Sequence, residues 1–126
     1  MKKNLKQYLP LHLRRGNEAE TVAEKYLTGQ GLHLISRNYY CKAGEIDLLM
    51  QDCNTLVFVE VRFRSNPYFG SAAESITAKK IQRIRKTAEH FLLTHTYFEH
   101  LYKRFDVLTI SAQSSKHEIL WIKDAF

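Results

Sequence analysis

Residues 44–64, GEIDLLMQDCNTLVFVEVRFR, constrain the fold of this chain more than any other segment of the sequence. Two mainly apolar runs flank a short polar stretch that contains Cys53 and Asn54. Apolar runs of this length on either side of a polar turn are typical of a β-hairpin. We therefore predict two antiparallel strands, residues 45–50 and 56–63, joined by a turn centred on Cys53 and Asn54.

The position of the turn determines which side chains face one another. Successive side chains in a strand point to opposite faces of the sheet. One face of the hairpin then pairs Ile46 with Val61, Leu48 with Val59 and Met50 with Val57. The other face pairs Leu49 with Phe58, Asp47 with Glu60 and Glu45 with Arg62. We expect the first face to pack on the core and the charges to gather at one end of the second.

Asp47 opposite Glu60 is the unusual pair of this hairpin. Like charges directly across two strands destabilise a sheet by up to about 1 kcal/mol. Two carboxylates that converge beside a core need a cation, a shared proton or a basic neighbour. Carboxylate oxygens suit Mg²⁺ or Mn²⁺ better than zinc, so the pair is a candidate metal site. The alternatives are an ion-pair patch in which Glu45 and Arg62 neutralise the acids, and a different turn geometry that separates them.

The rest of the chain predicts one α/β domain with a mixed sheet. Apolar residues recur at helical spacing in residues 17–30 and 77–95, and apolar runs at 32–38, 104–111 and 118–123 are typical of strands. The element order is then α-β-β-β-α-β-β, an α/β or α+β arrangement, with a loop at residues 65–75. A chain of 126 residues suits one domain. We place it at residues 16–126, after a basic arm at residues 1–15.

The charge of the chain favours a polyanionic partner. Its 19 Lys and Arg exceed its 13 Asp and Glu, for a net charge of +6, which is consistent with nucleic acid binding or simply with solubility. In the second predicted helix, Lys79, Arg83, Lys86 and His90 form one stripe at helical spacing. Such a stripe contacts phosphates in many proteins, and is also common on plain surface helices. Lys80 and Arg85 lie outside the stripe and are interpreted as generic surface charges.

No apolar run approaches the roughly 20 residues that cross a bilayer. The basic N-terminus also lacks the unbroken apolar stretch of a signal peptide, so we expect a cytoplasmic protein with no membrane partner. Near the other end of the chain, Asp106 either joins the acidic cluster or caps a local turn, and its spacing favours neither. Trp121 is interpreted as a core residue.

Four motifs in this order resemble the bacterial YraN family: Gly44-Glu45-Ile46-Asp47-Leu48, Phe58-Val59-Glu60-Val61-Arg62, Arg104-Phe105-Asp106 and Asp124-Ala125-Phe126. That family is grouped with the PD-(D/E)XK nuclease superfamily and is distantly similar to archaeal Holliday junction resolvases. The resemblance covers residues 16–126. It implies the restriction-endonuclease-like fold, a central mixed β-sheet flanked by helices.

The resemblance also implies a set of site residues. The metal-binding acids of the superfamily fall on Asp47 and Glu60, with the backbone carbonyl of Val61 as a further ligand. The glutamate typical of the family's first helix falls on Glu20, which would act through a water or a second metal. The motif lysine falls on Arg62, and arginine stays protonated and cannot act as a general base. Arg62 would then hold the scissile phosphate, while the metal generates hydroxide.

We therefore predict a Mg²⁺- or Mn²⁺-dependent endonuclease acting on branched or structured DNA. Five basic residues are expected to hold the nucleic acid backbone: Lys79, Arg83, Lys86, Arg14 and Arg15. One alternative is a non-catalytic nucleic-acid-binding module that retains the nuclease fold. Another is a structural adaptor that binds a protein through residues 97–102. The choice between DNA and RNA and the presence of a homodimer stay open at this stage.

Overall fold

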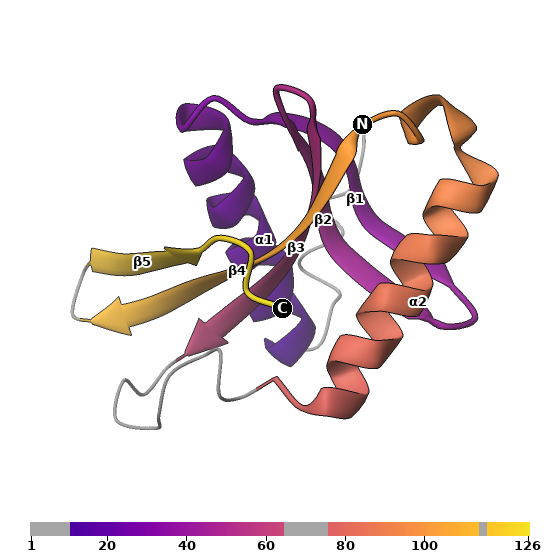
Figure 1. Cartoon of the computed structure of the whole chain (residues 1–126). Coiled ribbons are helices and arrows are strands. Elements are labelled where there is room, and N and C mark those ends of the chain that lie inside the picture. The colour runs from indigo at the N-terminus through magenta and orange to yellow at the C-terminus, as the bar shows by residue number, and fades with distance from the viewer. Residues whose placement is uncertain (1–10, 65–75, 114–115) are drawn as a thin grey trace, which may run out of the picture.

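The computed structural model describes residues 11–64, 76–113 and 116–126 (Figure 1). In chain order the elements are α1 (Leu11–Gly29), β1 (His33–Cys41), β2 (Gly44–Asp52), β3 (Thr55–Arg64), α2 (Ala78–Thr94), the short 3₁₀ helix η2 (Thr96–Phe98), β4 (Tyr102–Gln113) and β5 (Lys116–Ile122). The predicted loop at residues 65–75 lies outside the described residues. None of the described helices has the length and apolar character needed to cross a bilayer.

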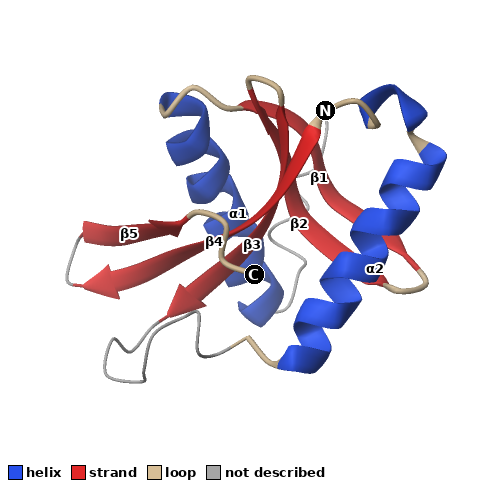
Figure 2. Ribbon diagram, viewed as in Figure 1, coloured by secondary structure: helices blue, strands red, loops and turns tan. Residues whose placement is uncertain are grey.

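The five strands form one mixed sheet in the order β1-β2-β3-β4-β5. β3 and β4 are parallel, and the other neighbouring strands are antiparallel. A parallel pair needs a crossover connection, and α2 lies between β3 and β4 in the chain. The two helices cover opposite faces of the sheet (Figure 2). The predicted α/β class, with its mixed sheet and its order of elements, is confirmed.

The face of the sheet under α1 carries the first apolar core. Ala19, Ala23 and Leu27 recur every four residues along α1, and each is at most 4% exposed. They pack against Leu48 and Val59 of the central strands. Side chains four residues apart share one face of a helix, so this spacing gives α1 its buried stripe.

The bounds of α1 differ from the prediction at one end. The helix begins at Leu11, so the last five residues of the predicted basic arm are helical, while residues 1–10 lie outside the described part. At its other end, Gly31 has a φ of 99° and the Leu32 N–H donates to the Leu27 carbonyl at 3.1 Å. This left-handed termination ends the helix and directs the chain into β1.

The opposite face of the sheet packs against α2. Ile84 and Phe91 of this helix are at most 5% exposed, and they pack with Phe58 of β3. The side chain of Thr77 accepts a hydrogen bond of 3.1 Å from the Lys80 backbone N–H and caps the helix. The predicted bounds of this helix are therefore confirmed to within one residue at each end.

The register of the β2–β3 hairpin agrees with the prediction along most of its length. The two strands pair from Asp52 opposite Thr55 to Leu48 opposite Val59. Both faces of this region are buried, because Leu49 packs under α2 while Leu48 packs under α1. The hairpin is thus a central part of the sheet rather than a surface ribbon with one polar face.

The predicted position of Ile46 is wrong. It does not share a face with Leu48 but packs in the core under α2. Asn38 of the neighbouring strand has a φ of 53°, and the residues on either side of it face different helices. Arg37 contacts Glu20 of α1, whereas Tyr39, which pairs with Ile46, packs against α2.

Candidate functional site

The candidate site lies where β2 and β3 stop pairing. Their last paired residues are Leu48 and Val59, and the next residues along the two strands are Asp47 and Glu60. From there β3 continues alongside β4, while β2 continues alongside β1. The separation of the two strands places both acids at the edge of an opening in the sheet.

At this opening the Asp47 side chain accepts a backbone hydrogen bond that a strand carbonyl would otherwise accept. Its Oδ2 accepts the N–H of Val61 at 2.9 Å. Because the N–H and C=O of one strand residue point to the same side, the Val61 carbonyl also faces the opening. Of the predicted ligands, Asp47, Glu60 and this carbonyl are therefore brought to one place.

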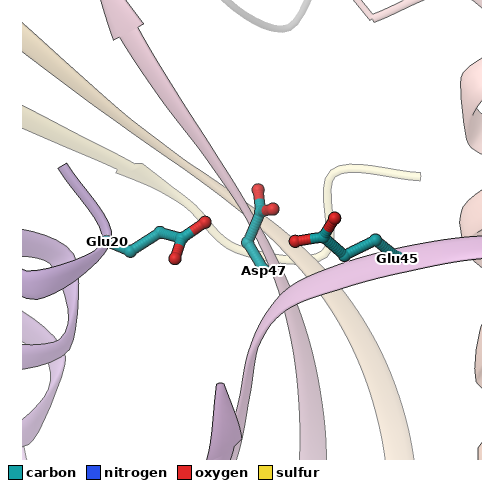
Figure 3. Close-up of side chains that lie close together, drawn as sticks. All are labelled: Glu20, Glu45 and Asp47. Atoms are coloured by element: carbon teal, nitrogen blue, oxygen red, sulfur yellow. The ribbon is translucent and has the colours of Figure 1, made fainter. Parts of the chain in front are cut away.

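Two further acids converge on Asp47. Glu20 reaches it from α1 and Glu45 from β2, with Asp47 between them (Figure 3). One carboxylate oxygen from each of the three lies within 4.8 Å of the others. Glu20 was a predicted site residue, whereas Glu45 was predicted only as a neutralising partner of the cluster. The structure adds Glu45 to the acidic group.

Burial and crowding make the charged form of Asp47 unfavourable. Burial, followed by repulsion from Glu60 and then from Glu20, raises the pKa of Asp47 from its usual 3.8 to about 8, against the Val61 hydrogen bond that lowers it. A hydrogen bond between the Asp47 and Glu60 side chains raises this pKa further. The raised pKa favours the neutral form of Asp47, so the two acids tolerate each other partly through a shared proton.

The pKa of Glu20 is also raised, chiefly because the carboxylate is buried, with a smaller contribution from Glu45. A hydrogen bond from Asn38 and the charge of Arg37 oppose this shift. The Arg37 Nη2 lies 3.7 Å from the Glu20 Oε2. Arg37 thus holds Glu20 in place from the outer strand β1.

Glu60 has two basic neighbours in addition to Asp47. It is 5% exposed, and its Oε1 lies 2.7 Å from the Lys80 Nζ and 3.7 Å from the Arg62 Nη1. The interpretation of Lys80 as a generic surface charge is wrong, because its side chain enters the site. Lys80 lies outside the cationic stripe of α2. Spacing within one helix does not predict its contact with Glu60, which lies on a strand.

Acidic and basic side chains face each other across a cleft of about 370 Å³. Its lining comprises Gly44, Glu45, Asp47, Glu60, Thr77, Lys79, Lys80, Arg83 and Ile84. One wall carries the acids Glu45, Asp47 and Glu60 of the strands, and the other is the first two turns of α2. Such a cleft can hold a cation on one side and an anion on the other.

Gly44 lets the β1–β2 turn approach α2 closely. A Cβ at this position would lie 3.2 Å from the Thr87 Oγ1, and the φ of Gly44 is 154°. Any other residue would be strained there and would press on the helix. The glycine thereby brings Glu45, the next residue, to the mouth of the cleft.

The predicted nucleic-acid-binding residues do not all lie together. Lys79 and Arg83 line the cleft, whereas Lys86 is exposed further along α2. Arg14 and Arg15 lie near the start of α1, and their side chains are outside the described part of the structure.

Asp106 does not join the acidic group. It is fully buried and accepts hydrogen bonds from the Arg104 Nε at 2.8 Å and Nη2 at 3.0 Å. The Trp121 Nε1 and the Asp124 N–H each donate to it at 2.9 Å. Of the two roles left open for Asp106, the structure gives it a local structural one, in which it binds the C-terminal segment to β4.

Comparison with known proteins identifies relatives along most of the chain. Residues 19–110 match the model of the uncharacterised protein family UPF0102. A UPF0102 protein from Saccharophagus degradans is 50% identical over 115 residues, 91% of this chain and 94% of the relative. One from Nitrosococcus oceani is 43% identical over 115 residues, 91% of this chain and 93% of the relative. One from Methylobacillus flagellatus is 50% identical over 111 residues, 88% of this chain and 95% of the relative.

Proposed function

This chain belongs to the uncharacterised protein family UPF0102, and we propose that it is a divalent-metal-dependent endonuclease of the PD-(D/E)XK type. Its substrate would be branched or structured DNA, and its metal Mg²⁺ or Mn²⁺. One observation carries the proposal: the carboxylates of Glu20, Glu45 and Asp47 converge within 4.8 Å beside Glu60. Glu45, Asp47 and Glu60 line one cleft together with the basic residues Lys79, Lys80 and Arg83.

The donor set fits a hard divalent cation. The group contains carboxylates and a backbone carbonyl, and these are the ligands that Mg²⁺ and Mn²⁺ prefer. The raised pKa values of Asp47 and Glu20 report crowded negative charge, which such a cation would neutralise. Asp47, Glu60 and the Val61 carbonyl would hold the ion, with Glu45 or Glu20 completing its coordination directly or through water.

The chemistry would be hydrolysis of a phosphodiester. A bound divalent ion lowers the pKa of its water and polarises a phosphoryl oxygen. Arg62, which lies 3.7 Å from Glu60, stays protonated and would bind the scissile phosphate through its paired N–H groups. Lys79 and Arg83, on the opposite wall, would hold the neighbouring backbone.

The choice of partner and compartment rests on charge and on resemblance. A net charge of +6 supports a polyanionic substrate. The preference for DNA, and for junctions or flaps over linear duplexes, comes from the resemblance to resolvases. A homodimer would suit a reaction that cuts two strands, and the proposed compartment is the cytoplasm.

The test is a cleavage panel of linear, flapped and four-way DNA with Mg²⁺ or Mn²⁺. We expect Asp47→Asn and Glu60→Gln each to reduce the cleavage rate by about 100-fold or more while circular dichroism shows a folded protein. Glu89→Gln, a matched change at an exposed position of α2, should cut at the wild-type rate. If both site variants cut as fast as wild type, the proposal is wrong.

One observation favours a second candidate, a nucleic-acid-binding module without catalysis. Arg62 stands where the superfamily has a lysine, so the chain lacks that potential proton acceptor. Arg62→Lys in the same panel separates the two candidates. If only this variant cuts, and the wild type binds DNA in a salt-sensitive way without turnover, the chain functions as a binding module.

A further inference from the structure

We infer that Lys80 is a resident counter-cation of this site, which holds Glu60 until a nucleic acid phosphate displaces it and so couples metal binding to nucleic acid binding. The inference rests on the proposed function and concerns how that site is loaded. The metal ion and the nucleic acid phosphate would each bind weakly alone, and each would bind more strongly when the other is present.

Lys80 occupies the place of a cation beside Glu60. Its Nζ lies 2.7 Å from the Glu60 Oε1, closer to this oxygen than the Arg62 Nη1 at 3.7 Å. A metal ion bound by Glu60 would compete with this ammonium group for the same carboxylate. The contact therefore lowers the affinity of the empty protein for a divalent ion.

The exposed fractions of the two side chains indicate which one moves. The Glu60 side chain is 6% exposed, and its strand is paired with Val107 of β4. The Lys80 side chain is 41% exposed and has a long flexible stem. Its backbone is held by the Thr77 cap, so the ammonium group can swing while the helix stays in place. Lys80 is thus the side chain that moves when the ion pair with Glu60 breaks.

A phosphate that enters the same cleft would be the new partner of the displaced Lys80 ammonium group. Lys79 and Arg83 share the basic wall with Lys80, so a phosphate that enters there meets three cations. Without a metal, that phosphate would also face the acids Glu45 and Asp47. When both ligands are present, the metal binds Glu60 and the phosphate binds Lys80. The coupling is reciprocal, since each ligand raises the affinity for the other.

The first test is Mn²⁺ binding by isothermal titration calorimetry on the metal-free protein. We expect Lys80→Met to bind Mn²⁺ about tenfold more tightly than wild type, within the usual range of coupling between sites. Lys80→Arg keeps the charge and should bind like wild type. Lys25→Met removes the same charge from an exposed position of α1 outside the cleft and should also bind like wild type.

The second test measures the coupling from the DNA side, with a labelled four-way junction in EDTA or in Ca²⁺. Wild type should bind the junction about tenfold more tightly in Ca²⁺, and Lys80→Met should lose most of this gain. Equal Mn²⁺ affinity of Lys80→Met and wild type would overturn the inference, even if Asp47→Asn and Glu60→Gln abolish cleavage. Absence of both Mn²⁺ binding and cleavage in the wild type would instead overturn the proposed function, and this inference with it.

Discussion

Val61 donates its backbone N–H to the carboxylate of Asp47 at 2.9 Å, at the point where β2 and β3 cease to pair. A side chain here takes the acceptor role that a strand carbonyl has elsewhere in the ladder. The acid is therefore built into the hydrogen bonding of the sheet, and its position follows from the strands. The change Asp47→Asn keeps an acceptor oxygen for this hydrogen bond while it removes the titratable carboxyl group.

Replacing Asp47 with Asn should stabilise the protein more as the pH rises. The pKa of Asp47 is about 8 in the folded chain against its usual 3.8, because burial and Glu60 disfavour the charge. The folded state then binds the proton more tightly than the unfolded state. This tighter binding of the proton by Asp47 contributes to stability below the usual pKa, and the contribution is lost as the pH rises from about 4 to about 8.

Urea denaturation of wild type and Asp47→Asn at pH 5, 7 and 9 in EDTA measures this effect. A tenfold difference in proton affinity between the folded and unfolded states corresponds to about 1.4 kcal/mol. We expect the difference in free energy of unfolding to move in favour of the variant by more than about 1 kcal/mol between pH 5 and 9. A difference that does not change with pH would contradict the raised pKa.

Metal binding should release a proton. The raised pKa of Asp47 favours a bound proton at neutral pH, and Asp47 must lose that proton to ligate a cation. We expect about one proton per Mn²⁺ at pH 6.5, with affinity that rises until about pH 8. Calorimetry in two buffers of different ionisation enthalpy counts the protons, and Asp47→Asn should release fewer. Release of none by the wild type would exclude a protonated Asp47.

The parts of the fold predicted correctly are those controlled by local patterns. The register of the hairpin follows from its turn, and the pairing of Leu48 with Val59 agrees with it. The bounds of α2 follow from its apolar stripe and from the Thr77 cap. Both features depend on residues that are close in sequence, so the spacing of these residues predicts the hairpin register and the helix bounds.

The features that spacing missed depend on tertiary contacts or on one unusual residue. Ile46 was placed on the wrong face because strict alternation was assumed, whereas Ile46 and Leu48 pack on opposite faces beside the left-handed Asn38 of the next strand. Lys80 was misinterpreted because its contact with Glu60 joins a helix to a strand. Glu45 was predicted beside Asp47, but its approach to Glu20 depends on how α1 packs.

Asn38 should tolerate glycine better than alanine. Its φ of 53° lies in the left-handed region, which costs most residues about 1–2 kcal/mol but costs glycine little. We expect Asn38→Ala to unfold at lower urea concentration than Asn38→Gly, with a free energy of unfolding about 1 kcal/mol smaller. Both variants lose the hydrogen bond to Glu20, so their comparison isolates the backbone. Equal stability would show that the conformation of residue 38 is not strained.

Asp106 should matter for stability and not for metal binding. Its buried carboxylate accepts four hydrogen bonds, from Arg104, Trp121 and Asp124, and these fasten the end of the chain to β4. Removing one partner of a buried charged pair costs about 3–5 kcal/mol. We therefore expect Asp106→Ala to lose about 3 kcal/mol or more in urea denaturation.

The Mn²⁺ affinity of the folded Asp106→Ala variant should equal that of wild type, because Asp106 belongs to a different network from the acids in the cleft. Asp106→Asn retains one acceptor oxygen and should lie between the two proteins in stability. A variant with wild-type stability but weaker Mn²⁺ binding would place Asp106 in the acidic group after all. Loss of stability alone leaves Glu45, Asp47 and Glu60 as the acids of the cleft, with Glu20 beside Asp47.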